Sequence, residues 1–189
     1  MIFEPRLFDK LAHAASIAVI GTNVFSLSKF VEEVKDIPGD IVECGTYRGG
    51  SAIAMAVSTH KKVWCFDTFS GMPEVTIHDQ HQKGDFTTTL DEVKRNVSDY
   101  QNIILVPGEF KDTIPEARIG LLALVYLDCD LYESYWTALA SFWKQLSPGG
   151  ILIAEDYPHE SCLGAKRACN EFFGPDSLQF ENNFWIKRK

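Results

Sequence analysis

The sequence predicts an α/β protein with a mainly parallel β-sheet, helices on both faces of that sheet and an antiparallel hairpin at the C-terminal end. Strand-like and helix-like stretches alternate along the 189 residues, and parallel strands require such helical crossovers. Residues 121–130, LLALVYLDCD, are continuously apolar up to two acids, which is typical of a strand buried on both faces. Five alternating strands and a two-stranded hairpin predict a seven-stranded sheet.

Composition and length indicate one soluble domain. Hydrophobic residues make up 46% and charged residues 23% of the chain, close to the averages of globular proteins. We therefore expect a single domain over residues 1–189, with residues 1–38 as a short N-terminal helical arm. The net charge of −8 and the scattered basic residues argue against a nucleic-acid partner.

Membrane insertion and disulfide bonding are also disfavoured. The apolar stretch LAHAASIAVIG, residues 11–21, is too short to span a bilayer. The five cysteines are odd in number and form no C-x-x-C pair. Reduced thiols and a cytoplasmic location are therefore expected.

The first third of the chain contains three predicted helices and one strand. Apolar periodicity predicts helices over residues 5–18 and 25–35, and a Pro-Gly pair then interrupts the pattern. The strand DIVEC follows at 40–44. Small and apolar residues at 50–60 fit a helix packed closely on a sheet.

The middle of the chain predicts two strands around a long loop and a helix. KKVWCFD at 61–67 is rich in β-formers and ends in an acid. Residues 69–87 carry turn and polar residues with little periodicity, which indicates a long and hence functional loop. A helix with hydroxyl capping residues is expected over 87–100, followed by the strand NIILVPG at 102–108.

After the strand at 121–130, the last part of the chain predicts two helices, one strand and the hairpin. Aromatic and apolar residues recur at helical spacing over 131–146, and SPGG ends the pattern. ILIAEDY at 151–157 is the fifth strand, and a helix is expected over 161–173. Residues 178–189 predict a hairpin that turns at a pair of asparagines.

The stretch DIVECGTYRGGSA, residues 40–52, places a glycine-rich break between the first strand and the next helix. It lacks the G-x-G-x-x-G pattern of dinucleotide-binding folds, which weakens a nicotinamide interpretation. Glu43, Gly45 and Gly49 form E-x-G-x-x-x-G instead. That carboxylate can meet an ammonium group while the glycines let a ligand lie against the backbone. A tight turn without a ligand is the alternative.

S-adenosylmethionine offers such an ammonium group and a ribose whose hydroxyls suit a carboxylate. Asp67 ends the second strand, where it is placed for the ribose, although a single strand-end acid is more typically solvated. Glu109 and Phe110 follow the third strand and offer a polar edge and an aromatic face to adenine. The predicted cofactor-binding residues are Glu43, Gly45, Thr46, Tyr47, Gly49, Ser51, Asp67, Thr68, Glu109, Phe110 and Asp128.

Three acids end the fourth and fifth predicted strands. Asp128 closes one of these strands, and Glu155 and Asp156 close the other. Neighbouring parallel strands would bring the three carboxylates together, where they would repel unless a cation such as Mg²⁺ lay between them. Such a metal would polarise a hydroxyl of an acceptor. Capping of loops or helices is the alternative role for Asp128 and Asp156.

Six stretches in order along the chain resemble the macrocin O-methyltransferase family, which modifies deoxysugars of macrolide and aminocoumarin antibiotics. The resemblance extends from about residue 39 to the end. It implies a Rossmann-like class I methyltransferase fold, S-adenosylmethionine, and Mg²⁺ held by Asp128, Glu155 and Asp156. The six stretches are IVECGTYRGGSA, FDTFSGMP, GEFKDTIP, YLDCDLYES, LSPGGILIAEDY and AKRACNEFF.

Two positions depart from the family pattern. Cys129 replaces the glycine of a D-G-D motif, and Glu155 replaces the first aspartate of a D-D pair. A longer carboxylate still binds a hard cation, so Mg²⁺ stays an expected ligand of this cluster. The N-terminal arm is shorter than in the family, so the acceptor is expected to differ from a macrolide.

The predicted catalytic residues are Asp128, as metal ligand and proton acceptor, and His159. His159 follows the fifth strand, and histidine is a common general base near neutral pH, so it is a candidate base, with a surface histidine as the alternative. His78 and His81 lie in the long loop, where two histidines without a third ligand are usually solvated. Trp136 and Trp143 are expected to pack in the core or in a homodimer interface.

Three classes of function remain open from the sequence. The leading one is a Mg²⁺-assisted O-methyltransferase that acts on a hydroxyl of a small molecule, with a sugar of a natural product as one candidate acceptor. An NAD-dependent oxidoreductase or epimerase would need a Y-x-x-x-K pair, which is absent from the sequence. A non-catalytic cofactor-binding or interaction protein would keep the glycine pocket without metal dependence.

Overall fold

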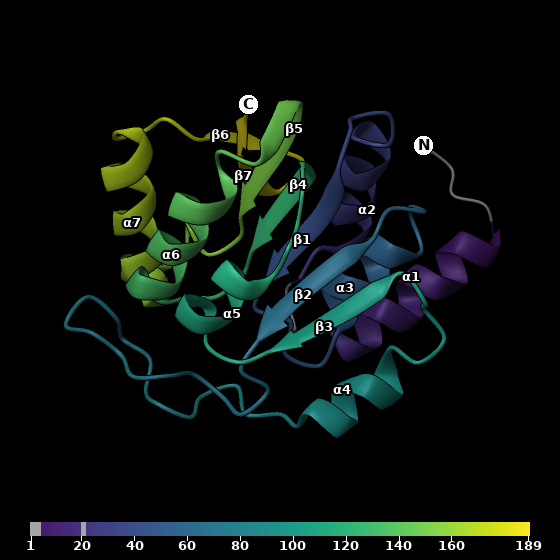
Figure 1. The fold of residues 1–189 in the computed structure, drawn as a ribbon, viewed down its shortest axis with the longest axis horizontal. Helices are drawn as coiled ribbons and strands as arrows, with labels where there is room; N and C mark the ends of the chain where they lie inside the picture. Colours follow the sequence, from purple (N-terminus) through teal and green to yellow (C-terminus); the bar gives the residue numbers. More distant parts are fainter. Residues whose placement is uncertain (1–4, 20–21) are drawn as a thin grey trace.

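In the computed structural model, which describes residues 5–19 and 22–189, a seven-stranded sheet lies between two layers of helices (Figure 1). The strand order is β3-β2-β1-β4-β5-β7-β6. Strands β1 to β5 run parallel, whereas β7 pairs antiparallel with both β5 and β6. The predicted α/β class, the parallel sheet and the C-terminal hairpin are confirmed.

The strands are short and mostly apolar, as expected for a parallel sheet covered on both faces. All six residues of β4, at the centre, are buried. The bounds are β1 Asp40–Cys44, β2 Val63–Asp67, β3 Ile103–Pro107, β4 Leu122–Leu127, β5 Leu146–Ala154, β6 Gln179–Glu181 and β7 Phe184–Arg188.

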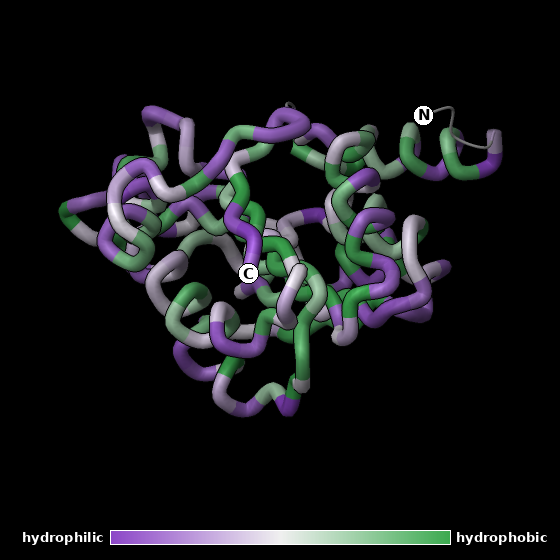
Figure 2. Tube along the Cα trace, turned by 90° about the horizontal axis from the view of Figure 1, so that it is seen from above, coloured by the Kyte–Doolittle hydropathy of each residue, from purple (hydrophilic) through white to green (hydrophobic). Residues whose placement is uncertain are grey.

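The helices divide between the two faces of the sheet. One hydrophobic cluster joins α5, α6 and α7 to one face, and two others join α1 to α4 to the opposite face. Figure 2 shows the hydrophobic segments gathered in the middle and hydrophilic ones in outer loops. The bounds are α1 Pro5–Ile17, α2 Val24–Glu33, α3 Gly50–Ala56, α4 Leu90–Asn96, α5 Phe110–Glu116, α6 Tyr132–Phe142 and α7 Leu163–Phe173, with a 3₁₀ turn at Glu160–Cys162.

The hairpin turn follows from its two asparagines. Glu181 pairs with Phe184, so Asn182 and Asn183 form a two-residue connection. Both have positive φ, 46° and 70°. Asparagine tolerates this region, and a turn with two positive φ values matches the twist of the flanking strands. The predicted turn is confirmed.

The structure differs from the sequence-based predictions at α5 and at the start of β5. Helix α5 was not predicted because it is seven residues long and contains Pro115, which leaves too little periodicity. Helix α6 ends at Phe142 rather than at 146, and β5 begins at Leu146. Leu122 pairs with Leu146 and Leu124 with Ile151, so the SPGG segment bulges within the strand instead of preceding it.

None of the helices among the described residues combines the length and apolar character needed to cross a bilayer. Trp143 packs against Phe173 with ring centroids 4.8 Å apart, whereas Trp136 is 37% exposed and stacks on Tyr132. The homodimer interface, the single-domain boundaries and the cytoplasmic location all stay predictions.

Candidate active site

A cavity of about 320 Å³ lies at the carboxyl ends of the parallel strands. The loops that follow β1, β2, β3, β4 and β5 all contribute to its lining. Strand order reverses between β1 and β4, and ligands bind at such switch points in open α/β sheets. The long loop after β2 passes along this edge toward α7 (Figure 1).

The glycine break forms the wall of the cavity next to β1. Gly45 has a φ of +90°, and a Cβ there would collide with the carbonyl oxygen of Asp128. Only glycine therefore lets the turn after β1 approach the loop after β4. Gly49, with a φ of +94°, precedes α3 and is not among the lining residues.

Asp67 fixes this turn from the neighbouring strand. Its Oδ2 accepts hydrogen bonds from the backbone amides of Thr46 and Tyr47, both at 2.8 Å. Its Oδ1 accepts from the amide of Phe69 at 2.8 Å. Three backbone amides therefore satisfy both oxygens of this carboxylate. Asp67 thus organises the pocket wall, and its predicted contact with ribose stays a prediction.

Glu43 lies beneath the turn and does not line the cavity. Its side chain is completely buried, and neither oxygen has a hydrogen-bond partner among the described residues. Burial raises the pKa of Glu43 to about 7, while the nearby hydroxyls of Ser51 and Thr46 oppose the increase. The predicted direct contact with an ammonium group has no support from this placement.

The other predicted cofactor-binding residues line the cavity. Thr68 donates its hydroxyl to the carbonyl of Gly71 at 2.6 Å, which shapes the start of the long loop. Glu109 precedes α5 and pairs with Lys111 at 2.8 Å. Those of the predicted set that reach the cavity are Gly45, Thr46, Tyr47, Ser51, Asp67, Thr68, Glu109, Phe110 and Asp128.

The acids after β4 and β5 converge at the floor of the cavity. Carboxylate oxygens of Asp128, Glu155 and Asp156 lie within 4.8 Å of one another, as the strand positions predicted. Asp128 accepts a hydrogen bond from the Tyr126 hydroxyl at 3.2 Å. Asp156 accepts from the backbone amides of Cys129 and Asp130 at 3.0 and 2.9 Å, which holds the loop after β4 in place.

Burial and neighbouring negative charges raise the pKa of all three carboxyl groups. For Asp128 the pKa is well above the usual value, first because of burial and then because of Asp156 and Glu155. Burial followed by the charge of Asp156 raises the pKa of Glu155 to about 7. Burial and the charge of Asp130 raise the pKa of Asp156 to about 7. The site thus concentrates negative charge that a cation would neutralise.

The donor set fits a hard divalent cation. All three side chains present oxygen, which Mg²⁺ prefers, and two of them come from adjacent residues at the end of one strand. The side chain of Glu155 is longer than that of aspartate, but it still places a carboxylate oxygen in the cluster. The replacement of aspartate by glutamate therefore keeps the three oxygen donors together.

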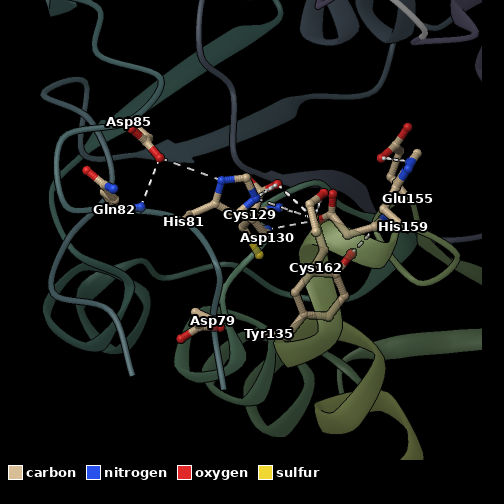
Figure 3. Close-up of polar contacts among 12 residues, drawn as sticks. Asp79, His81, Gln82, Asp85, Cys129, Asp130, Tyr135, Glu155, His159 and Cys162 are labelled. Atoms are coloured by element: carbon tan, nitrogen blue, oxygen red, sulfur yellow. Dashed lines mark hydrogen bonds and ion pairs between the residues drawn. The ribbon is translucent and has the colours of Figure 1, made fainter. Parts of the chain in front are cut away.

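His159 lies at the edge of this cluster. Its Nε2 is 3.4 Å from Oε2 of Glu155, and its side chain is 53% exposed. Both residues line the cavity, and Figure 3 shows them beside each other. The histidine is therefore placed where it can exchange protons with both solvent and the cavity.

The long loop contributes cavity residues that the sequence did not assign. His81 was expected to be solvated, but its side chain is only 17% exposed and lies 3.5 Å from Oδ1 of Asp130. Nδ1 of His78 lies 2.9 Å from a guanidinium nitrogen of Arg167 on α7. The motif D-C-D at residues 128–130 could have indicated Asp130 as a site residue. No sequence pattern indicated His81, because it lies far along the chain from Asp130.

The same loop is fastened to α6 and α7. Oδ1 of Asp79 accepts a hydrogen bond from the amide of Tyr132 at 2.8 Å, and its Oδ2 accepts from the amide and hydroxyl of Thr76. A Cβ at Gly164 would collide with Asp79, so glycine on α7 admits the loop. The loop therefore covers one side of the cavity as a lid, defined here as residues 68–89.

Comparison with known proteins shows to which family the chain belongs. A profile of the macrocin-O-methyltransferase (TylF) family matches residues 12–177, most of the 189-residue chain. The chain belongs to the macrocin O-methyltransferase family. The match begins well before residue 39 and includes the second half of α1 and all of α2.

Members of the family with assigned functions are similar over much of this chain. A tetracenomycin-C 4'-O-methyltransferase that acts on a dimethoxyrhamnosyl derivative, from Streptomyces olivaceus, is 36% identical over 86% of this chain and 70% of its own length. Demethyldecarbamoylnovobiocin O-methyltransferase from Streptomyces niveus is 35% identical over 78% of this chain. The chain spans 63% of the latter protein.

Solved structures give the same result. The O-methyltransferase NovP superposes with a TM-score of 0.77 at 31% identity, covering 88% of this chain and 78% of NovP. The calicheamicin methyltransferase CalS11 superposes with a TM-score of 0.76 over 100% of this chain and 94% of CalS11. At 20% identity, CalS11 supports the fold alone.

Membership in the macrocin O-methyltransferase family settles the general class of function. The chain is an enzyme of the S-adenosylmethionine-dependent O-methyltransferase class, as the sequence predicted. The oxidoreductase and non-catalytic alternatives are thereby superseded. The metal, the acceptor and the roles of individual residues are proposals.

Proposed function

We propose that this enzyme transfers the methyl group of S-adenosylmethionine to a hydroxyl of a sugar carried by a natural product, and that Mg²⁺ assists the transfer. Sugar and natural-product acceptors appear in the names of the relatives from Streptomyces. The observation that carries the metal assignment is the convergence of the Asp128, Glu155 and Asp156 carboxylates at the cavity floor.

The cavity divides into two functional sides in this proposal. Gly45, Thr46 and Asp67 organise the wall next to β1 and β2, where the cofactor would lie across the switch point. Glu109 and Phe110 would meet its adenine. The carboxylates and the lid face the other side, where the acceptor would bind.

Asp128, Glu155 and Asp156 would hold the metal, and His159 would accept the acceptor proton. Bound there, Mg²⁺ would lower the pKa of the acceptor hydroxyl and orient it. His159 lies beside Glu155, with 3.4 Å between Nε2 and Oε2, so it would stand next to the metal ligands. The lid would exclude water, because Asp79 fastens it to the start of α6.

The decisive experiment measures methyl transfer from S-adenosylmethionine to glycosylated hydroxyl compounds by mass spectrometry, with and without EDTA. We expect turnover that EDTA removes and added Mg²⁺ restores. Transfer that is unaffected by complete metal removal would overturn the metal assignment. Absence of S-adenosylmethionine binding by calorimetry would overturn the assignment of the cavity.

The role of His159 is tested separately by substitution. His159→Gln should lower kcat by about 100-fold or more while leaving S-adenosylmethionine affinity unchanged, since general bases contribute factors of this size. His60→Gln is a matched control, because His60 is exposed and lies outside the cavity. Equal kcat values for the two variants would remove His159 from the mechanism.

A further inference from the structure

A second group of possible metal ligands lies beside the carboxylate cluster and shares no residue with it. His81 comes from the lid, Asp130 from the loop after β4, and Cys162 from the 3₁₀ turn before α7. Figure 3 shows the imidazole of His81 directed toward Asp130 and Cys162. Methyl transfer as proposed above uses none of these three side chains.

The separations of the three ligand atoms match the edges of a tetrahedron around zinc. Sγ of Cys162 lies 3.6 Å from Nε2 of His81 and 3.3 Å from Oδ1 of Asp130, and Nε2 lies 3.5 Å from Oδ1. Zinc bonds of about 2.3 Å to sulfur and about 2.0–2.1 Å to nitrogen and oxygen give tetrahedral edges of about 3.3–3.6 Å.

The three ligands are held in position by their surroundings. Asp130 has a φ of 58°, and its backbone amide donates to Asp156 at 2.9 Å, which fixes this strained residue. Oδ2 of Asp85 lies 3.7 Å from the second imidazole nitrogen of His81. A carboxylate behind a ligating histidine is the usual outer partner in zinc sites. Cys162 is only 3% exposed.

We propose that His81, Asp130 and Cys162 form a second metal site that takes Zn²⁺ or a similar borderline-soft divalent ion. One sulfur, one nitrogen and one oxygen suit zinc, whereas the all-oxygen cluster nearby suits magnesium. All three residues line the cavity, so an ion held by them would be reached from the cavity. Since His81 is the ligand from the lid, the ion ties the lid to the body of the protein.

A hydrogen-bonded cluster without metal is the competing explanation. The thiol of Cys162 would then donate to Asp130, and burial, the largest cause, raises the pKa of that thiol and keeps it protonated. Zinc replaces the thiol proton when it binds. The two explanations therefore differ in whether Cys162 becomes a thiolate in the presence of the metal.

Titration of the metal-free enzyme with Co²⁺ tests the site directly, because a thiolate ligand gives cobalt a near-ultraviolet charge-transfer absorption. We expect this absorption in the parent enzyme and its loss in Cys162→Ser. The Zn²⁺ affinity, measured by competition, should fall at least about 100-fold in Cys162→Ser and in His81→Ala. Asp85→Asn should weaken it about 10-fold, because outer partners have smaller effects.

Two control variants separate this site from its neighbours. Asp128→Asn should retain the absorption, because Asp128 belongs to the carboxylate cluster. Cys129→Ser should also retain it, which excludes a thiolate from the other cysteine of the cavity. An absorption that persists in Cys162→Ser, or the absence of any such absorption in the parent enzyme, would overturn the proposal.

Hydrogen exchange of the lid gives a second readout that does not depend on turnover. At Zn²⁺ ten times its Kd, lid opening should fall about 10-fold in the parent enzyme and remain unchanged in His81→Ala. Equal exchange with and without Zn²⁺ would contradict the tie between metal and lid. Failure of these tests leaves the methyl-transfer proposal intact, because that proposal depends on Asp128, Glu155 and Asp156.

Discussion

Asp67 after β2 and the carboxylates after β4 and β5 occupy comparable places on one edge of the sheet, but their charges are balanced differently. Asp67 accepts hydrogen bonds from three backbone amides. Asp128, by contrast, accepts from the Tyr126 hydroxyl and faces Glu155 and Asp156. Donors within the protein thus satisfy the carboxylate of Asp67. The cluster of Asp128, Glu155 and Asp156 instead brings negatively charged groups close together.

The comparison shows how the same residue type serves structure in one place and chemistry in another. Hydrogen bonds to a charged carboxylate stabilise a turn, so loss of Asp67 should lower stability first. Carboxylates that repel one another reduce stability, and such groups persist at functional sites. The two regions should therefore respond oppositely to substitution.

The largest effect is expected at Asp128. Asp128→Asn should reduce kcat/KM by about 1000-fold, equivalent to about 4 kcal/mol, because it removes a ligand of the proposed metal. Without divalent cations the same variant should unfold at a higher temperature than the parent, since it relieves repulsion. Asp99→Asn, at an exposed position, is the control that should change neither quantity. A less stable Asp128→Asn would contradict the difference between the two regions.

The opposite pattern is expected at Asp67. Asp67→Ala should lower the free energy of unfolding by about 3 kcal/mol, because the amides of Thr46, Tyr47 and Phe69 lose their acceptor. Denaturant titration measures this change, and Asp67→Asn should be intermediate because one acceptor oxygen remains. A change below about 0.5 kcal/mol would show that solvent replaces these bonds at no cost.

Magnesium should stabilise the protein through the carboxylates alone. At 100 times its Kd the ion should add about 2.7 kcal/mol to the free energy of unfolding, visible as an increase in Tm. The increase should persist in Asp67→Asn and disappear in Asp128→Asn. A Tm that rises equally in both variants would indicate non-specific binding.

The smallest effect is expected at Glu43. Its folded pKa of about 7 exceeds the ordinary value of 4.5, so the native state keeps a proton that the unfolded chain has lost. This contribution to stability is complete below pH 4.5 and is lost as the pH rises through 7. Glu43→Gln lacks this loss, so its stability relative to the parent should increase by about 1–3 kcal/mol between pH 5 and 8. Parallel pH profiles of the two proteins would contradict a protonated Glu43.

Local sequence patterns predicted the order of most strands and helices. The alternation of strands and helices placed Asp67, Asp128 and Asp156 at strand ends because side-chain periodicity is a local property. The Asn182-Asn183 turn was equally readable from two residues. Helix α5 was missed because a short helix held by tertiary contacts leaves a weak pattern.

The sequence by itself determined the α/β order, the glycine break and the acids that meet after β4 and β5, because strand direction alone brings parallel carboxyl ends to one edge. Only the tertiary structure decided that Glu43 is buried beneath the turn and that Asp67 is saturated by backbone amides. It also decided that His81 meets Cys162, 81 positions away in the chain. Such contacts depend on where a long loop folds back, and no local periodicity encodes that path.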